Sequence, residues 1–522
     1  IQFTDYGVVI ATGWPAQWDG KFWTEKSYTD QKGLKADDEC KIWVDIGQQN
    51  VHFYLKPGEC VRMPRMSVLF HEGGEDRGIN LWRRWAVTHL TPCEGEKPVH
   101  PRLIRMNSGG GEEFTCATEK NQIEGIENLH KLPLYKDSVW WIDAGWYPCD
   151  DCAGEKHWVR VGTWEADISR FPRGLGPVGE RLEKEGIPFL MWFEPERVMY
   201  GQKMEREHPQ WILRLKSQRQ LSENELDGQT FMLNLANEEC VDWLIEHIDR
   251  LIKEFRIKIY RQDFNIEPLW YWRDNEEDDR RGILENYHVQ GYLRYWDALK
   301  LRNPGLIIDA CASGGRRYDL ETMRRAVPMH PTDYGYGVHS VKLAFAQTMA
   351  EWFPYFRLMV LSWEREDGSY NSDGCFSDGK NQYEHSGKQD AFDVHCALAP
   401  MISPGDATEE QLERIWKKGA ELMIEGDYYP LTPFSAENNH YVARQFWKPE
   451  WKEGFVQIIR LEFCKRDAYH LVLRGLEKER KYIFKDVETD ESFIAYGKNM
   501  TEEGIDVSIP PRSGKMLWFH TI

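Results

Sequence analysis

Positive charge, cysteine and long hydrophobic runs are all scarce in this chain of 522 residues. The 66 Lys and Arg residues are outnumbered by 85 Asp and Glu residues, and the formal net charge is −19. This balance excludes nucleic acid and anionic membranes as main partners. No stretch approaches the ~18 apolar residues that a membrane-spanning helix needs, so we expect a soluble protein. The chain begins at Ile1 without a Met. We therefore expect earlier residues to be missing, and cytoplasmic, secreted and periplasmic locations all stay open.

The cysteines do not form the pattern of a disulfide framework. There are 11, an odd number scattered along the chain, whereas disulfide-rich domains carry an even number at short spacings. One lone C-x-x-C, from Cys149 to Cys152, is compatible with unpaired loop thiols, a local disulfide or, least well, a metal site, because zinc would need a second pair of ligands. We predict no metal and no cofactor.

The pattern of apolar runs predicts three parts. Residues 1–98 hold short β-rich runs separated by Gly, Pro and Asp, which indicate an incomplete N-terminal β-sandwich. Over 99–425, strand-length runs such as 138–147 and 255–264 alternate with helical patterns, which predicts the parallel sheet of a (β/α)8 TIM barrel. Residues 426–522 predict a C-terminal antiparallel β-sandwich. The expected fold class is α/β, a barrel flanked by these two parts.

Acidic side chains follow several of the predicted barrel strands. Side chains at the carboxyl ends of barrel strands face the active site. The acids near these ends are Asp143, Glu194, Glu196, Asp263, Asp309 and Asp333. The sequence has neither H-E-x-x-H nor G-x-S-x-G, the motifs of zinc and serine hydrolases. Clustered carboxylates without them are typical of glycoside hydrolysis, where one attacks or activates water and another protonates the leaving oxygen. A metal-dependent barrel hydrolase stays open.

Four short motifs occur in order along the chain. They are "WPAQW" (14–18), W-F-E-P-E within 162–198, "YRQDFN" (260–265) and "CASGGRRYD" (311–319). Together they resemble glycoside hydrolase family 36, the melibiase-like α-galactosidases, which share a clan with family 27. The resemblance covers most of the chain and implies a glycosidase built on a TIM barrel. The family's large N-terminal sandwich is only partly present, which indicates a fragment.

The resemblance implies catalytic roles for two of the acids. Asp263 matches the nucleophile of the family's K-W-D-x-N strand. The family's proton donor follows the next strand, and "PTDYG" puts the acid/base at Asp333. Two successive strand ends can bring carboxylates to the ~5–5.5 Å that a retaining enzyme needs. Asp319 is the alternative, but it precedes a helix start, which favours an N-cap or an ion pair.

The resemblance also implies a set of sugar contacts. One acid resembles the family's hydroxyl-binding Asp, two residues flank the nucleophile, two lie in the Gly-rich loop near the sugar's 2-position, and three Trp are candidate stacking walls. These predicted contacts are Asp143, Trp146, Trp164, Trp192, Arg261, Asn265, Cys311 and Gly314. Glu194 and Glu196 fit the site and a structural ion pair equally well.

The chain departs from the family pattern at three places around the sugar. Ala144 stands where the family commonly has a second Asp, so one hydroxyl contact is lost or made from elsewhere. Arg261 replaces a Lys, and a forked guanidinium is not equivalent to a compact ammonium. "GQTFMLN" (228–234) stands where the family has an Arg. The two catalytic Asp are kept, so these changes bear on the identity of the sugar.

We therefore expect a retaining, exo-acting glycoside hydrolase that releases terminal α-linked galactose-type sugars from oligosaccharides or glycoconjugates. The alternatives are an α-N-acetylgalactosaminidase or α-galactosaminidase, a raffinose-synthase-like transglycosylase, and a non-catalytic carbohydrate-binding barrel. The expected partner is an α-galactoside or α-galactosaminide glycan. A homo-oligomer stays open, because family members are often held together by the N-terminal sandwich.

Overall fold

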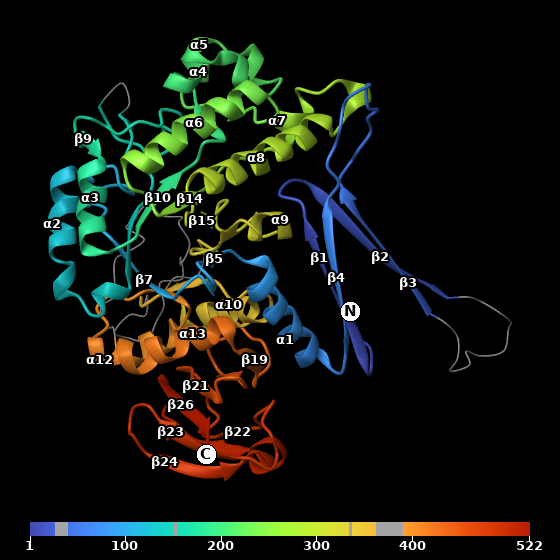
Figure 1. Ribbon diagram of the computed structural model, residues 1–522, viewed down its shortest axis with the longest axis vertical. Helices are drawn as coiled ribbons and strands as arrows, with labels where there is room; N and C mark the ends of the chain where they lie inside the picture. Colours follow the sequence, from blue (N-terminus) through green and yellow to red (C-terminus); the bar gives the residue numbers. More distant parts are fainter. Residues whose placement is uncertain (27–39, 151–153, 334–336, 362–389) are drawn as a thin grey trace.

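The computed structural model describes residues 1–26, 40–150, 154–333, 337–361 and 390–522 (Figure 1). Its centre is an eight-stranded sheet in the order β16-β15-β14-β10-β8-β7-β18-β17. All neighbouring strands in this sheet are parallel. Of its eight strands, the last along the chain, β18, pairs with the first, β7. The strands are β7 (Arg102–Met106), β8 (Ser138–Ile142), β10 (Phe189–Phe193), β14 (Ile259–Gln262), β15 (Ile307–Ala310), β16 (Ala326–Val327), β17 (Arg357–Met359) and β18 (Met401–Ser403). Such a curled parallel sheet confirms the predicted barrel class.

Alternate side chains of these strands enter two different cores. One set packs together inside the barrel and includes Ile104, Val139, Trp141, Leu190, Ile259 and Ile307. The other set packs against the helices and includes Trp140, Ile142, Met191, Phe193, Tyr260 and Ile308. Burial on both faces explains why the strands appear in the sequence as continuous apolar runs rather than alternating ones.

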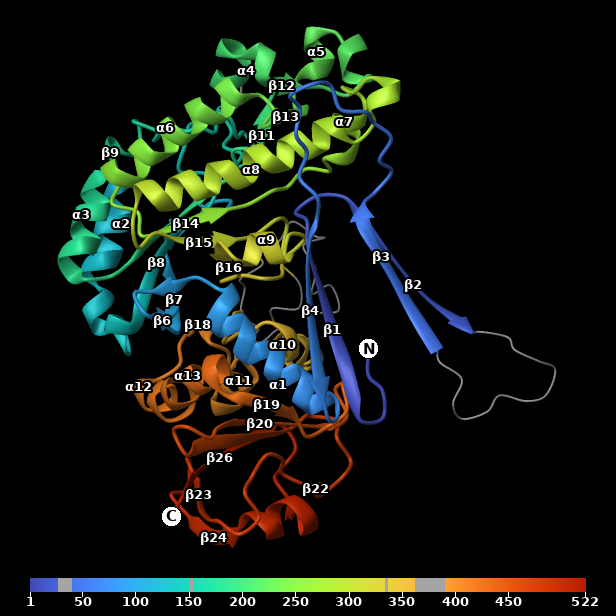
Figure 2. The same ribbon diagram turned by 45° about the vertical axis from the view of Figure 1, so that its right-hand side comes forward.

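Helices cover the outside of the barrel (Figures 1 and 2). The longer ones are α2 (Glu119–Glu127), α3 (Gly176–Glu185), α6 (Glu238–Glu254), α8 (Ile283–Arg302) and α10 (His339–Trp352). The shorter ones are α4 (Lys203–Glu207), α5 (Glu223–Leu226), α7 (Leu269–Arg273), α9 (Leu320–Met323), α11 (Ala391–Cys396), α12 (Glu409–Gln411) and α13 (Lys418–Glu425). No helix in the described ranges combines the length and apolarity needed to cross a bilayer.

A small antiparallel sheet is inserted after β10. It has the order β11-β13-β12 and consists of β11 (Arg197–Met199), β13 (Thr230–Leu233) and β12 (Ile212–Leu213). The segment 228–234, where the family pattern has an Arg, forms β13 and the turn before it. Three other short strands lie earlier in the chain. β5 (Cys93–Glu94) and β6 (Lys97–Pro98) precede β7, and β9 (Pro172–Leu175) directly precedes α3.

The N-terminal part forms two separate two-stranded antiparallel sheets. β1 (Tyr6–Gly13) pairs with β4 (Arg65–Glu72), and β2 (Trp18–Lys26) pairs with β3 (Cys40–Gln48). The β2–β3 ribbon points away from the barrel (Figure 2). Residues 51–59 form no strand and contribute one isolated bridge, at His52. α1 (Glu75–Trp85) then leads towards the barrel.

The C-terminal part is a six-stranded antiparallel sheet with a two-stranded sheet, β22 (Tyr469–Leu471) and β25 (Ile505–Val507), beside it. The larger sheet consists, in spatial order, of β19 (Asp427–Pro430), β20 (Tyr441–Lys448), β21 (Glu453–Arg460), β26 (Ser513–Thr521), β23 (Lys481–Asp486) and β24 (Ser492–Tyr496). Antiparallel sheets at both ends agree with the predicted class. We propose that the three parts divide near residues 98 and 425, just before β7 and β19.

Gly291 allows α8 to approach the chain just before α6, and replacing it tests this packing. A Cβ at this position would lie 1.9 Å from the carbonyl oxygen of Leu235. Gly291→Ala is expected to destabilise the fold by about 1–3 kcal/mol, because the clash outweighs the ~1 kcal/mol that Ala gains over Gly in a helix. Chemical denaturation measures the change. Leu301→Ala, an exposed position on the same helix, should stay within about 0.5 kcal/mol of the parent. Equal stability of the two variants would contradict the packing argument.

Candidate active site

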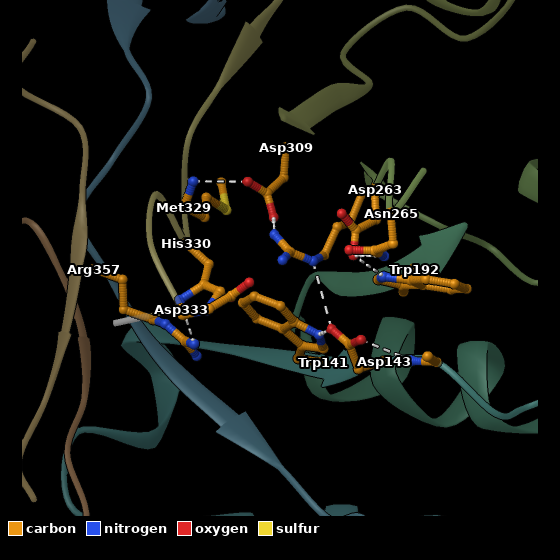
Figure 3. Close-up of polar contacts among 12 residues, drawn as sticks. Trp141, Asp143, Trp192, Asp263, Asn265, Asp309, Met329, His330, Asp333 and Arg357 are labelled. Carbon is orange, nitrogen blue, oxygen red and sulfur yellow. Dashed lines mark hydrogen bonds and ion pairs between the residues drawn. The ribbon is translucent and has the colours of Figure 1, made fainter. Parts of the chain in front are cut away.

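Three of the predicted acids lie together at the carboxyl ends of the barrel strands. Asp143 follows β8, Asp263 follows β14, and Asp333 lies in the segment after β16 (Figure 3). Their charges influence one another: Asp263 raises the pKa of both Asp143 and Asp333. The barrel thus brings three carboxylates from separate strands into one electrostatic cluster, as acid residues at strand ends predict.

Asp263 is surrounded by hydrogen-bond donors. Its Oδ1 accepts from the backbone N–H of Phe264 (2.7 Å) and of Ser313 (2.9 Å). Its Oδ2 accepts from Nδ2 of Asn265 (2.8 Å) and from Nε1 of Trp192 (3.1 Å). Four donors from four residues fix the orientation of both carboxylate oxygens. Such a carboxylate is held in its charged form.

The pKa of Asp263 reflects this environment. Burial alone would raise it, but the positive charge of Arg261 and the hydrogen bonds from Ser313, Asn265 and Phe264 lower the pKa of Asp263 to about 2. Asp263 is therefore ionised at neutral pH. An anionic carboxylate at the mouth of a barrel can act as a nucleophile or stabilise a developing positive charge.

The loop after β15 touches both Asp263 and Asp333. Ser313 donates its backbone N–H to Asp263, and a Cβ on Gly314 would lie 2.7 Å from N and 2.9 Å from Oδ2 of Asp333. Four successive residues, 312–315, have positive φ angles of 129°, 51°, 74° and 115°. Two of them are not Gly, and such backbone is uncommon and clusters at functional sites. This single loop therefore lies against both carboxylates.

Asp333 is hydrogen-bonded to a histidine from its own segment. Nε2 of His330 lies 3.0 Å from Oδ1 of Asp333, and Nδ1 of His330 lies 2.7 Å from Nη2 of Arg357 on β17. Burial would raise the pKa of Asp333, but the contact with His330 outweighs it, and the net shift is downward. Burial and the charge of Arg357 lower the pKa of His330 to about 3, so the imidazole is neutral at neutral pH.

Arg261 links Asp143 to a deeper acid. Its Nη1 donates to Oδ2 of Asp309 at 2.7 Å, and its Nε lies 3.5 Å from Oδ2 of Asp143. The guanidinium also lies over the ring of Trp141, 4.6 Å from the centroid. Trp141 in turn donates from Nε1 to Asp143 at 2.5 Å. Burial raises the pKa of Asp143, while Arg261 opposes this. Asp143 and Arg261 are therefore held in a fixed relation at the base of the site.

Glu113 is an acid of the site that the sequence interpretation missed. It lies in the loop after β7, at a positive φ of 44°, and Phe114 next to it donates its N–H to the carbonyl of Ala144 at 2.8 Å. Burial first, and then the charges of Asp143 and Asp333, raise the pKa of Glu113 to about 8. Glu113 is thus protonated at neutral pH and can donate a hydrogen bond. The signal for it was the "GGGEE" run following the first barrel strand.

Glu194 and Glu196 are structural ion-pair members. Glu194 is fully buried and accepts from Nε of Arg197 at 2.8 Å. Glu196, equally buried, accepts from both Nη1 (2.6 Å) and Nη2 (2.9 Å) of Arg317 and lies 2.9 Å from Nε2 of His288. Burial alone would raise the pKa of Glu196, but Arg317 and His288 lower it to about 2. Of the two roles that the sequence left open for these residues, a place in the site or a structural ion pair, the ion pair fits both.

Two of the predicted stacking walls lie in the core instead. Trp146 is fully buried and Trp164 is 2% exposed, and both pack with the helix-facing core. A ring with no exposed face cannot stack on a sugar, so these two assignments are withdrawn. Trp192 is also fully buried, but its Nε1 holds Asp263, which makes it a positioning residue. The sequence could not distinguish these roles, because Trp in apolar strands and loops enters either core.

Two further predictions concern neighbouring residues. Asp319 is the N-cap of α9 and accepts from the backbone N–H of Glu321 and Thr322, which confirms the predicted cap. Cys152 of the C-x-x-C pair lies outside the described residues, so its pairing with Cys149 stays a prediction. Among the residues that the structure describes, no group of three or more His, Cys, Asp or Glu is arranged to hold a metal ion.

Comparisons with known proteins agree with the family resemblance of the sequence. A family model described as Melibiase matches residues 124–354. Alpha-galactosidase Mel36A of Lactobacillus acidophilus is 21% identical over 480 residues, which cover 88% of this chain and 60% of that protein. Alpha-galactosidase 2 of Hypocrea jecorina is 25% identical over 469 residues, covering 84% and 56%. The chain therefore spans less than two thirds of the length of these relatives.

Solved structures show the same fold. The crystal structure of a variant of the GH36 alpha-galactosidase AgaA from Geobacillus stearothermophilus, in complex with raffinose, superposes with a TM-score of 0.72 at 18% identity. The match covers 100% of this chain and 72% of that one. Likeness at this level of identity concerns the fold.

Gly314→Ala tests whether the 312–315 loop positions Asp333. The added methyl would lie against the backbone and carboxylate of Asp333, so kcat/KM on an aryl α-galactoside is expected to fall on the order of 100-fold. Gly186→Ala is the matched control, because Gly186 also has a left-handed φ (72°) but open space around its Cβ. The control should lose about 1–2 kcal/mol of stability and keep its kcat/KM. Equal activity of both variants would mean that the loop does not position Asp333.

Glu196→Gln tests the structural role of that carboxylate. Removing its charge leaves Arg317 buried without a counter-charge, so the variant is expected to lose about 3–5 kcal/mol at neutral pH. The folded pKa of about 2 lies below the unfolded value of about 4.3. The contribution of Glu196 is therefore complete above about pH 4.3 and is lost as the pH falls through about 2. Denaturation at several pH values should show the gap to the parent closing on acidification.

The matched control for this variant is Glu165→Gln. Glu165 pairs with Lys203 on the surface, where both side chains are well exposed, and such a pair contributes only about 0–1 kcal/mol. A gap between Glu196→Gln and the parent that widens on acidification would rule out the linkage argued for Glu196.

Proposed function

Because the chain belongs to glycoside hydrolase family 36, the melibiase-like family, we propose that it is an α-galactosidase. In this proposal it releases terminal α-linked galactose-type sugars from oligosaccharides by two displacements that together retain the anomeric configuration. The observation that carries the proposal is the loop 312–315, which contacts Asp263 through Ser313 and Asp333 through Gly314. One loop thereby contacts two acids from successive parts of the barrel mouth.

The first displacement uses the two acids in different protonation states. The ionised Asp263 attacks the anomeric carbon and forms a glycosyl ester, while the bond from that carbon to the glycosidic oxygen breaks. Asp333 gives its proton to the departing oxygen. The oxocarbenium-like transition state carries positive charge, which neighbouring carboxylates such as Asp143 stabilise.

The second displacement reverses these roles. Asp333, now ionised, takes a proton from a water molecule that attacks the anomeric carbon, and the ester bond to Asp263 breaks. The electrostatics support this alternation, because the charge of Asp263 raises the pKa of Asp333. Formation of the ester removes that charge, so the pKa of Asp333 falls and Asp333 is more fully ionised for its role as the base in the second step.

The sugar contacts are proposed from the same geometry. Asp143, Arg261 and Asn265 present polar groups beside Asp263, and Cys311 and Gly314 belong to the loop that joins the two catalytic acids. Glu113, anchored to Ala144 through Phe114, can provide the hydroxyl contact for which Ala144 has no side chain. Its protonated carboxyl would act as a donor to a ring oxygen substituent.

An α-galactosaminidase is the second candidate, and the charge of the site favours it. Asp143, Asp263 and Asp333 lie near Arg261, which is already paired with Asp309. The excess of acids suits a sugar with an ammonium group at its 2-position. The two candidates are separated by comparing kcat/KM on aryl α-galactoside, α-galactosaminide and α-N-acetylgalactosaminide.

Substitution of the two catalytic Asp tests the mechanism. Asp263→Ala is expected to lower kcat on the preferred aryl glycoside on the order of 10⁴-fold or more, because no other group can form the ester. Asp333→Ala should lose far less on p-nitrophenyl substrates, whose leaving group needs little protonation, than on raffinose-type sugars. Azide should rescue Asp333→Ala with a glycosyl azide of retained configuration, and Asp263→Ala with one of inverted configuration.

Asp319→Ala is the matched control for these variants. Asp319 is the alternative acid and caps α9, so its loss should cost about 1 kcal/mol of stability and leave turnover intact. Wild-type turnover by Asp263→Ala would refute the proposed mechanism, and azide rescue of Asp319→Ala in place of Asp333→Ala would transfer the acid/base role to Asp319.

A further inference from the structure

A chain of three side chains leads from the interior of the barrel to Asp333. Arg357 on β17 donates from Nη2 to Nδ1 of His330 at 2.7 Å, and Nε2 of His330 lies 3.0 Å from Oδ1 of Asp333 (Figure 3). Arg357 and His330 are each 6% exposed. The ring of His330 also packs edge-on against the ring of Trp141, with 6.1 Å between the centroids. The guanidinium of Arg357 lies over the Trp141 ring, 4.6 Å from its centroid. Both side chains are therefore held on several sides.

The contact with Arg357 determines which nitrogen of His330 carries the proton. A guanidinium has donors only, so Nδ1 of His330 must accept. A neutral imidazole has one N–H, which is then at Nε2 and points to Asp333. The nearby charge of Arg357 disfavours a second proton on the ring, and the pKa of His330 falls to about 3. His330 is thus a neutral donor with a fixed tautomer over the working range of a hydrolase.

Other charged or titratable groups also act on Asp333. They come from the loop after β7, from β14 and the residue that follows it, and from the loop after β15, and are Glu113, Arg261, Asp263, Cys311 and Tyr318. Asp263 raises the pKa of Asp333, whereas the hydrogen bond from His330 and the charge of Arg261 lower it. The protonation of Asp333 therefore depends on opposing effects, of which the His330 contact is the largest after burial.

We propose that His330, held in one tautomer by Arg357, is a positioning residue that orients Asp333 and sets the upper pH limit at which this acid still carries its proton. The inference rests on the proposed function, in which Asp333 is the acid/base. A donor to an ionised carboxylate stabilises the charged form. His330 thereby makes Asp333 a stronger acid and shifts the range of activity to lower pH than Asp263 and Glu113 alone would allow.

The test is the pH dependence of kcat/KM on raffinose, whose sugar leaving group needs protonation. His330→Leu removes the donor, so the alkaline limb of the profile should move to higher pH, on the order of one pH unit for one charge-assisted hydrogen bond. His330→Gln retains an amide N–H that can reach Asp333 and should keep the limb close to that of the parent. His339→Leu is the matched control, because His339 forms another buried pair, with Asp393 at 2.7 Å, away from the site.

The possible results are distinguishable. The proposal is supported if the alkaline limb of the pH profile moves in His330→Leu but stays close to that of the parent in His330→Gln and in His339→Leu. An unmoved limb in a folded His330→Leu overturns it. Should His330→Leu fail to fold, Arg357→Met is expected to add an ionisation of His330 to the profile, and a profile of the parent's shape would overturn the proposal. Full activity of Asp333→Asn on raffinose would instead refute the acid/base assignment itself.

Discussion

The ionised state of Asp263 is the constraint on which the rest of the site depends. A carboxylate taken out of water costs several kcal/mol unless other groups replace its hydration. Here the replacement comes from Trp192 at the end of β10, from Phe264 and Asn265 just after β14, and from Ser313 in the loop after β15. These donors belong to three neighbouring strands, so they meet only when the parallel sheet has formed in register. The barrel and the ionised Asp263, the proposed nucleophile, are therefore stabilised together.

The acids at the barrel mouth fall into two groups by their partners. Glu194, Glu196 and Asp309 are fully buried and paired with Arg197, Arg317 and Arg261. They fix the loops around the site and the guanidinium of Arg261. Asp143, Asp263, Asp333 and Glu113 instead influence one another's pKa values. Repulsion among them is tolerated because one member, Glu113, stays protonated at neutral pH. The negative charge that a bound substrate would face is thus smaller than the number of acids suggests.

The sequence was sufficient for the barrel and for the acids at its strand ends, because both follow from local patterns. Apolar runs of strand length that end in Asp263 or Asp143 are visible without a structure. The roles of Trp146 and Trp164 were not accessible, since a strand buried on both faces hides which side each ring enters. Glu113 and His330 were missed for another reason: their roles depend on residues from other strands, Asp143 for Glu113 and Arg357 for His330. The pattern of apolar residues also did not predict the strand register within the N-terminal ribbons, including that of β2.

Arg261 shows how the departures from the family pattern can leave the chemistry intact. Its guanidinium is bonded to Asp309, lies over Trp141 and approaches Asp143. A single ammonium could not make these contacts at once, because it lacks the planar fork that stacks on a ring while donating in two directions. Much of the Arg261 charge is therefore used within the protein, to hold Asp143 and to oppose the burial of Asp263. Ala144 and segment 228–234 remove other groups from the rim, while the loop that joins Asp263 to Asp333 keeps its left-handed backbone. These departures thus lie around Asp263 and Asp333, the proposed catalytic pair, and leave in place the loop that contacts both.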